Sequence, residues 1–134
     1  MALYALTRGP NVGVDLERIR PDFAGDDIAQ RFFAPAEVAA LRAVPADLRT
    51  KAFFNCWTRK EAFIKARGMG LSLPLDQFVV SLAPGESPAL VSAQNDPQAA
   101  QRWCLYELEP GDGYVAAFAV EGKGCELQCW RWTS

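Results

Sequence analysis

Residues 12–18 of the 134-residue chain alternate between apolar side chains and small or acidic ones. The two sets occupy opposite phases of the pattern: Val12, Val14 and Leu16 against Gly13, Asp15 and Glu17. Successive side chains of a β-strand point to opposite faces of its sheet, so this period of two predicts a strand. A further strand is predicted over residues 3–7, and the turn residues Gly9-Pro10-Asn11 between the two indicate a hairpin.

The middle of the chain has helical spacing instead. We expect short helices over residues 26–33 and 36–43, the second with Pro35 at its first position, where a missing N–H costs nothing. A longer helix is expected from a cap at Asp47 to about Ala66. Its apolar positions recur every three or four residues, which predicts one buried face: Ala52, Phe53, Cys56, Trp57, Phe63 and Ile64.

The rest of the chain, after the helix-ending Gly68-Met69-Gly70, returns to strand-like segments. The predicted strands are residues 78–82, 89–93, 102–109, 114–120 and 126–132. Clusters of Pro, Gly, Asn and Asp separate them, which favours hairpins and an antiparallel meander. The predicted fold is α+β: a single domain over residues 1–134, with an antiparallel sheet packed against one long helix plus short helices.

Composition narrows the chemistry. The net charge of −2 argues against a nucleic-acid binder, and no run of about 20 apolar residues predicts a membrane span. No signal peptide is evident, so a cytoplasmic protein is expected. The chain has no histidine, which excludes Ser-His-Asp and Cys-His catalysis and His-containing zinc sites within it. Its four cysteines are expected to be reduced thiols, mostly buried: Cys56, Cys104, Cys125 and Cys129.

Asp15 and Glu17 are the first candidates for chemistry. They stand two apart on the predicted strand, so both carboxylates leave the same face. Two hard oxygen ligands at this spacing suit Mg²⁺ or Mn²⁺, which accept carboxylates, waters and substrate phosphates together. Taken alone, the pair is better explained as the solvated polar face of an edge strand.

The long helix carries the second candidate group. Glu61 and Lys65 are four residues apart and share a face, with Trp57 one turn earlier. A carboxylate and an ammonium group on one face can bind a metal and the phosphate beside it. The ordinary alternative is an exposed Glu–Lys pair worth about 0.2–0.5 kcal/mol, with Trp57 and Phe63 in the core. The glycines after the helix do not open a second one, so they do not form a Walker-type phosphate loop.

The order and spacing of four sequence segments together resemble one family, the 4′-phosphopantetheinyl transferases, and within it the two-lobed, surfactin-synthetase-associated class. The matching segments are Val12-Gly13-Val14-Asp15-Leu16-Glu17, Arg31-Phe32-Phe33, Trp57-Thr58-Arg59-Lys60-Glu61-Ala62-Phe63-Ile64-Lys65 and Gly68-Met69-Gly70-Leu71-Ser72-Leu73-Pro74-Leu75. The Gly-Val-Asp-x-Glu and Trp-x-x-Lys-Glu-Ala-x-x-Lys patterns are the two signatures of that family. The resemblance extends from about Leu3 to Trp132.

The resemblance implies an enzyme that moves the phosphopantetheine arm of coenzyme A onto a serine of an acyl or peptidyl carrier protein. It implies that Asp15, Glu17 and Glu61 bind Mg²⁺ on the pyrophosphate of coenzyme A. Lys65 matches a phosphate-contacting lysine that can also protonate the leaving group, and Lys60 matches a lysine that steadies a phosphate. Glu61 is also the candidate base for the carrier serine, directly or through a metal-bound water.

The chain departs from the two-lobed class in length, because it corresponds only to the second half. The first half usually supplies basic contacts to the adenine and 3′-phosphate of coenzyme A, and these have no counterpart here. Three interpretations stay open: a homo-oligomer that restores the missing half, a separate N-terminal half, or an inactive homologue that acts as a binding module. A generic α+β domain with coincidental motifs is the remaining alternative.

Overall fold

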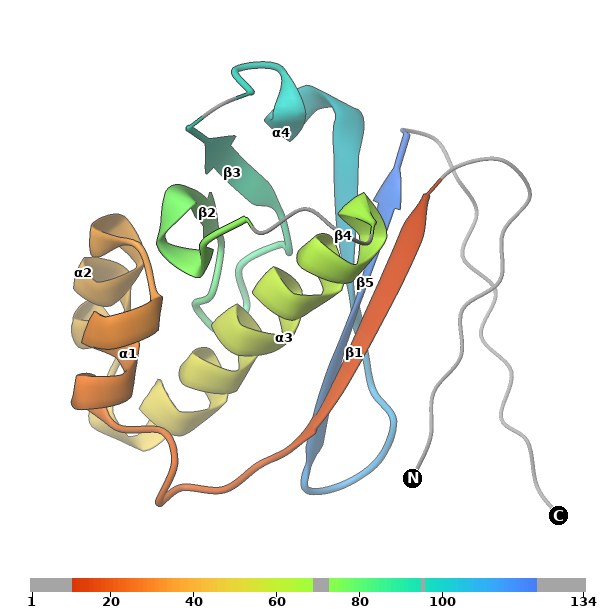
Figure 1. Cartoon of the computed structure of the whole chain (residues 1–134). Helices are drawn as coiled ribbons and strands as arrows, with labels where there is room; N and C mark the ends of the chain where they lie inside the picture. The colour runs from red at the N-terminus through yellow and green to blue at the C-terminus, as the bar shows by residue number, and fades with distance from the viewer. Residues whose placement is uncertain (1–10, 69–72, 95, 123–134) are drawn as a thin grey trace, which may run out of the picture.

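The computed structural model describes residues 11–68, 73–94 and 96–122 (Figure 1). The strands expected over residues 3–7 and 126–132 lie outside these ranges, as do Cys125 and Cys129. Cys56 is a buried free thiol and Cys104 a partly buried one. Across the described part of the chain, no helix is long and apolar enough to cross a membrane.

The larger sheet is antiparallel and contains β1 (Val12–Arg18), β5 (Tyr114–Glu121) and β4 (Trp103–Leu108), in that order. The strand β5 is central, which agrees with its predominantly buried side chains. A second antiparallel pair joins β2 (Phe78–Val80) to β3 (Leu90–Ala93). The expected single meander is therefore wrong for the described residues, whose strands are divided between two sheets.

The helices follow their sequence signals closely. They are α1 (Asp26–Phe32), α2 (Pro35–Ala43), α3 (Arg49–Arg67) and the short α4 (Ala99–Arg102), with 3₁₀ turns η1 (Ala46–Leu48) and η2 (Leu75–Gln77). Pro35 begins α2 as predicted, and Gly68 ends α3 with a positive φ of 101° that favours glycine. Asp47 is not the cap of α3, because η1 precedes the helix and Leu48 occupies the cap position.

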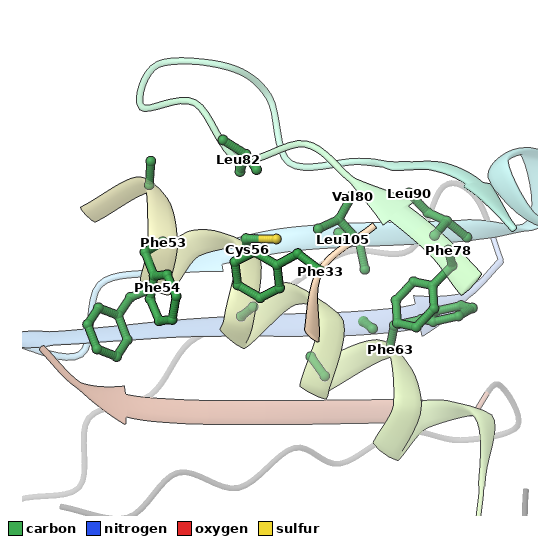
Figure 2. Close-up of a cluster of buried hydrophobic side chains, with 14 of the residues drawn as sticks. Phe33, Phe53, Phe54, Cys56, Phe63, Phe78, Val80, Leu82, Leu90 and Leu105 are labelled. Atoms are coloured by element: carbon green, nitrogen blue, oxygen red, sulfur yellow. The ribbon is translucent and has the colours of Figure 1, made fainter. Parts of the chain in front are cut away.

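The core lies between α3 and the two sheets. The figure shows aromatic and aliphatic side chains from α3 meeting those of β2, β3 and β4 (Figure 2). Phe63 is fully buried, and its ring centroid lies 4.9 Å from that of Phe78 and 5.1 Å from that of Trp103. Trp57 packs edge-on against Phe23 and Phe32 from the α1 side. Both aromatic residues of the helix motif therefore have packing roles, as expected.

The alternation in β1 is confirmed, but the covered face is the small and acidic one. Gly13 and Asp15 pair with Ala119 and Ala117 of β5, and these four residues are buried. The opposite face carries apolar side chains that are partly exposed: Val12, Val14, Leu16, Tyr106, Leu108 and Phe118. The interpretation that Asp15 lies on a solvated polar face is therefore wrong, because α3 packs over this face.

Candidate active site

Gly13 lies where the backbones of β1 and α3 approach each other closely. A Cβ atom at this position would stand 2.2 Å from the carbonyl oxygen of Ala62 and 2.4 Å from the amide nitrogen of Ala66. No side chain fits in that space, so the strand backbone lies directly against the helix. Residues two and four positions later on β1 share the face of Gly13, which brings Asp15 and Glu17 beside α3.

Asp15 is the buried acid of the site, with only 6% of its surface exposed. Its Oδ1 accepts a hydrogen bond of 2.6 Å from Nζ of Lys65, the nearest described cation to this carboxylate. Its Oδ2 is buried and has no hydrogen-bond partner in the described structure. Burial raises the pKa of Asp15, and Lys65 opposes that shift. A buried carboxylate oxygen without a partner is costly, so this atom indicates a place for a cation or donor.

Glu17 and Glu61 lie close enough to Asp15 for its charge to raise their pKa values. Burial raises the pKa of Glu17, the charge of Asp15 raises it further, and a hydrogen bond with Trp57 lowers it. Burial also raises the pKa of Glu61, again reinforced by Asp15 and opposed by Lys65. Both glutamates are half-buried. The fold therefore brings together the four residues that sequence reasoning had selected on β1 and α3.

Comparison with known proteins assigns the chain to a family. A family model described as the 4′-phosphopantetheinyl transferase superfamily matches residues 11–119, which include all four residues. The chain belongs to the 4′-phosphopantetheinyl transferase superfamily.

Two 4′-phosphopantetheinyl transferases are similar in sequence to most of this chain. The 4′-phosphopantetheinyl transferase HetI of Nostoc sp. is 39% identical over 132 residues, which are 98% of this chain and 52% of HetI. The 4′-phosphopantetheinyl transferase Sfp of Bacillus subtilis is 38% identical over 101 residues, 75% of this chain and 43% of Sfp. The chain therefore spans about half the length of the relatives it matches, or less.

Solved structures share the fold at lower identity. The holo-[acyl-carrier-protein] synthase of Thermotoga maritima superposes with a TM-score of 0.64 at 21% identity, over 85% of this chain and 64% of that one. The coenzyme A complex of the synthase from Chronobacterium ammoniagenes superposes with a TM-score of 0.60 at 24% identity, over 84% and 96%. These likenesses support the α+β fold of this chain.

Asp15, Glu17 and Glu61 are the residues of this chain available to hold a divalent cation. Within residues 11–68, 73–94 and 96–122, no three acidic or thiol side chains already stand in an arrangement that encloses a metal. Mg²⁺ commonly takes one or two protein carboxylates and completes its shell with waters and substrate phosphates. The unpartnered Oδ2 of Asp15 and the two adjacent glutamates fit that requirement.

Lys60 does not fit the phosphate-binding role expected for it. Its side chain is 1% exposed and forms an ion pair of 2.7 Å with Glu37 of α2, while it also donates to the carbonyl oxygen of Phe78. Glu37 in turn accepts hydrogen bonds from the amides of Ala34 and Val80, each at 2.8 Å. This buried network joins α2, α3 and β2, so the phosphate contact predicted for Lys60 is wrong in this structure.

Sequence reasoning missed two residues that position the site. Glu37 lies 23 residues before Lys60, and no local pattern links the two. Gly13 gave a detectable signal, because a glycine inside a strand often marks a close approach of another backbone. Its presence between Val12 and Val14 would have indicated that the face of Asp15 is the packed one.

Proposed function

We propose that this chain catalyses the Mg²⁺-dependent transfer of 4′-phosphopantetheine from coenzyme A to a serine of an acyl or peptidyl carrier protein. The observation that carries the proposal is the buried, half-satisfied carboxylate of Asp15, held between Glu17 of its own strand and Glu61 and Lys65 of α3. Membership of the superfamily and the names of HetI and Sfp support the same reaction.

The reaction breaks a phosphoanhydride bond of coenzyme A and forms a phosphodiester bond to the carrier serine. The serine oxygen of the carrier bonds to the phosphorus of the phosphopantetheine arm, and the bond from that phosphorus to the oxygen of 3′,5′-ADP breaks. The serine proton leaves to a base, for which Glu61 of α3, whose side chain is half-buried, is the candidate. Burial and the charge of Asp15 raise the pKa of Glu61 in the metal-free chain, and Lys65 opposes that shift.

The acidic residues and Lys65 have separate roles in this proposal. Asp15, Glu17 and Glu61 would hold Mg²⁺, which when bound neutralises charge on the transferred phosphoryl group and on the leaving group. Lys65 is half exposed, with 52% of its side chain accessible, so its ammonium can reach a phosphate of coenzyme A. It is also the candidate donor of a proton to the departing 3′,5′-ADP.

A second half completes the site in this proposal, supplied by another copy of the chain or by a separate polypeptide. The support is the sheet face opposite α3, where Val14, Leu16 and Phe118 are partly exposed. An apolar face of this kind marks a surface for association.

The alternative is a catalytically inactive homologue that keeps the fold and acts as a binding module. A transfer assay separates the two functions. The purified chain is incubated with coenzyme A, Mg²⁺ and several apo carrier proteins, and the carriers are weighed by mass spectrometry. The enzyme proposal predicts the added mass of one phosphopantetheine group, abolished by a chelator. Absence of transfer to every carrier by a folded, associated chain would support the binding module instead.

A further inference from the structure

The ion pair between Lys65 and Asp15 occupies the place where a cation is needed. Nζ of Lys65 lies 2.6 Å from Oδ1 of Asp15, and Asp15 is 6% exposed while the Lys65 side chain is 52% exposed. The lysine therefore reaches inward from the surface to the buried acid. The charges of Glu17 and Glu61 also interact with this ammonium group. In this structure Lys65 is the ion-pair partner of Asp15.

A metal ion and the Lys65 ammonium group cannot both bind the Asp15 carboxylate as Lys65 does in this structure. The three acids carry up to three negative charges, and one positive charge from Lys65 partly balances them. A divalent cation that binds Asp15 must displace or repel the ammonium, because like charges a few ångströms apart disfavour each other. The displaced lysine stem is flexible and exposed, so it has a clear path to a neighbouring anion.

We propose that Lys65 acts as the internal counterion of Asp15 before the metal binds, and that the exchange of this ammonium group for the metal couples metal binding to coenzyme A binding. The inference rests on the proposed function. Once the metal has taken Asp15, the released ammonium is free for a phosphate of coenzyme A. The metal ion frees Lys65 for a phosphate of coenzyme A, and coenzyme A holds Lys65 away from the metal ion. By reciprocal linkage, each ligand then raises the affinity of the chain for the other.

The chain offers a matched control for a test of this exchange. Lys51 lies on the same helix, is 41% exposed and pairs with Glu107 at 3.4 Å, well outside the acidic cluster. Lys65→Met and Lys51→Met each remove one ammonium group and keep the aliphatic stem. Mn²⁺ alone serves as the probe, and its binding is followed by the electron paramagnetic resonance signal of the free ion, without coenzyme A.

The expected result is that Lys65→Met binds Mn²⁺ about tenfold more tightly than the wild-type chain, while Lys51→Met binds like the wild type. Added coenzyme A should then tighten Mn²⁺ binding by a larger factor in the wild-type chain than in Lys65→Met. Unchanged or weaker Mn²⁺ binding by Lys65→Met would overturn the proposal, and so would an equal coenzyme A effect in the two proteins.

The outcome is separable from the proposed function. Tighter Mn²⁺ binding by Lys65→Met with no transfer by the wild-type chain would uphold the counterion exchange and reject the enzyme. Transfer by the wild-type chain, with unaltered Mn²⁺ binding in Lys65→Met, would uphold the enzyme and reject the counterion exchange. Absence of Mn²⁺ binding by the wild-type chain and by both variants would reject the counterion exchange and the metal assignment together.

Discussion

Replacement of Gly13 by alanine perturbs the geometry of the site without touching a charged group. The added Cβ would stand 2.2 Å from Ala62 O, 2.4 Å from Ala66 N and 3.0 Å from Ala66 Cα. Ordinary contacts begin near 3.4 Å, so β1 and α3 must separate by about 1 Å. All three atoms belong to the helix backbone, which cannot yield as a flexible side chain can.

Two magnitudes follow from this shift. Overpacking of this kind costs about 1–3 kcal/mol in the free energy of unfolding. The same shift separates Asp15 on β1 from Glu61 and Lys65 on α3, and misplacement by about 1 Å can lower a catalytic rate by roughly 100-fold. Gly13→Ala should therefore lose more activity than its stability loss explains, when transfer is measured at a temperature where the variant is fully folded.

Urea unfolding gives the stability, and the initial rate of carrier modification gives the activity. Gly25→Ala is the control, because nothing lies within 4 Å of a Cβ at that position. It should keep the transfer rate of the wild-type chain and change stability by less than about 1 kcal/mol. The reasoning fails if Gly13→Ala retains wild-type stability and rate, or if Gly25→Ala loses as much activity.

Three further predictions concern the neighbouring residues. Lys60→Met should destabilise the fold by about 3–5 kcal/mol, because it leaves the buried charge of Glu37 unpaired; a stable variant with a raised KM for coenzyme A would restore the phosphate-binding role. Glu61→Gln should abolish transfer while urea unfolding shifts by less than about 1 kcal/mol, since the side chain is half exposed; retention of full activity would remove Glu61 from the machinery. Sedimentation should show self-association of the wild-type chain at micromolar concentration, weakened by Val14→Lys on the partly exposed sheet face; a strictly monomeric wild-type chain that transfers normally would contradict the requirement for a second half.

Sequence periodicity predicted the elements of the site better than their packing. The spacing of apolar residues located α3 almost to its ends, and the period of two located β1. Both signals are local, because side-chain direction repeats along one helix or one strand. They placed Asp15 with Glu17, and Glu61 with Lys65, each pair on one face. The short α4 was missed, since its few residues leave no helical period to detect.

The remaining features depend on contacts between distant segments. The choice of the buried face of β1 was governed by the size of Gly13, which admits α3, rather than by the hydrophobicity of Val12 and Val14. The role of Lys60 depends on Glu37 of another helix, so its position beside Glu61 in the sequence was misleading. Only the packing of α3 on β1 shows that Lys65 reaches Asp15.

The most direct test of the acidic site is the binding of Mn²⁺ by three otherwise identical proteins. Wild type, Asp15→Asn and the control Asp22→Asn are titrated with Mn²⁺, and bound metal is counted by calorimetry. Asp22 is exposed and lies outside the cluster, so its amide variant tests for a general loss of negative charge. One Mn²⁺ site per chain is expected in the wild type and in Asp22→Asn, and its loss is expected in Asp15→Asn. Equal Mn²⁺ binding by all three proteins would contradict this expectation.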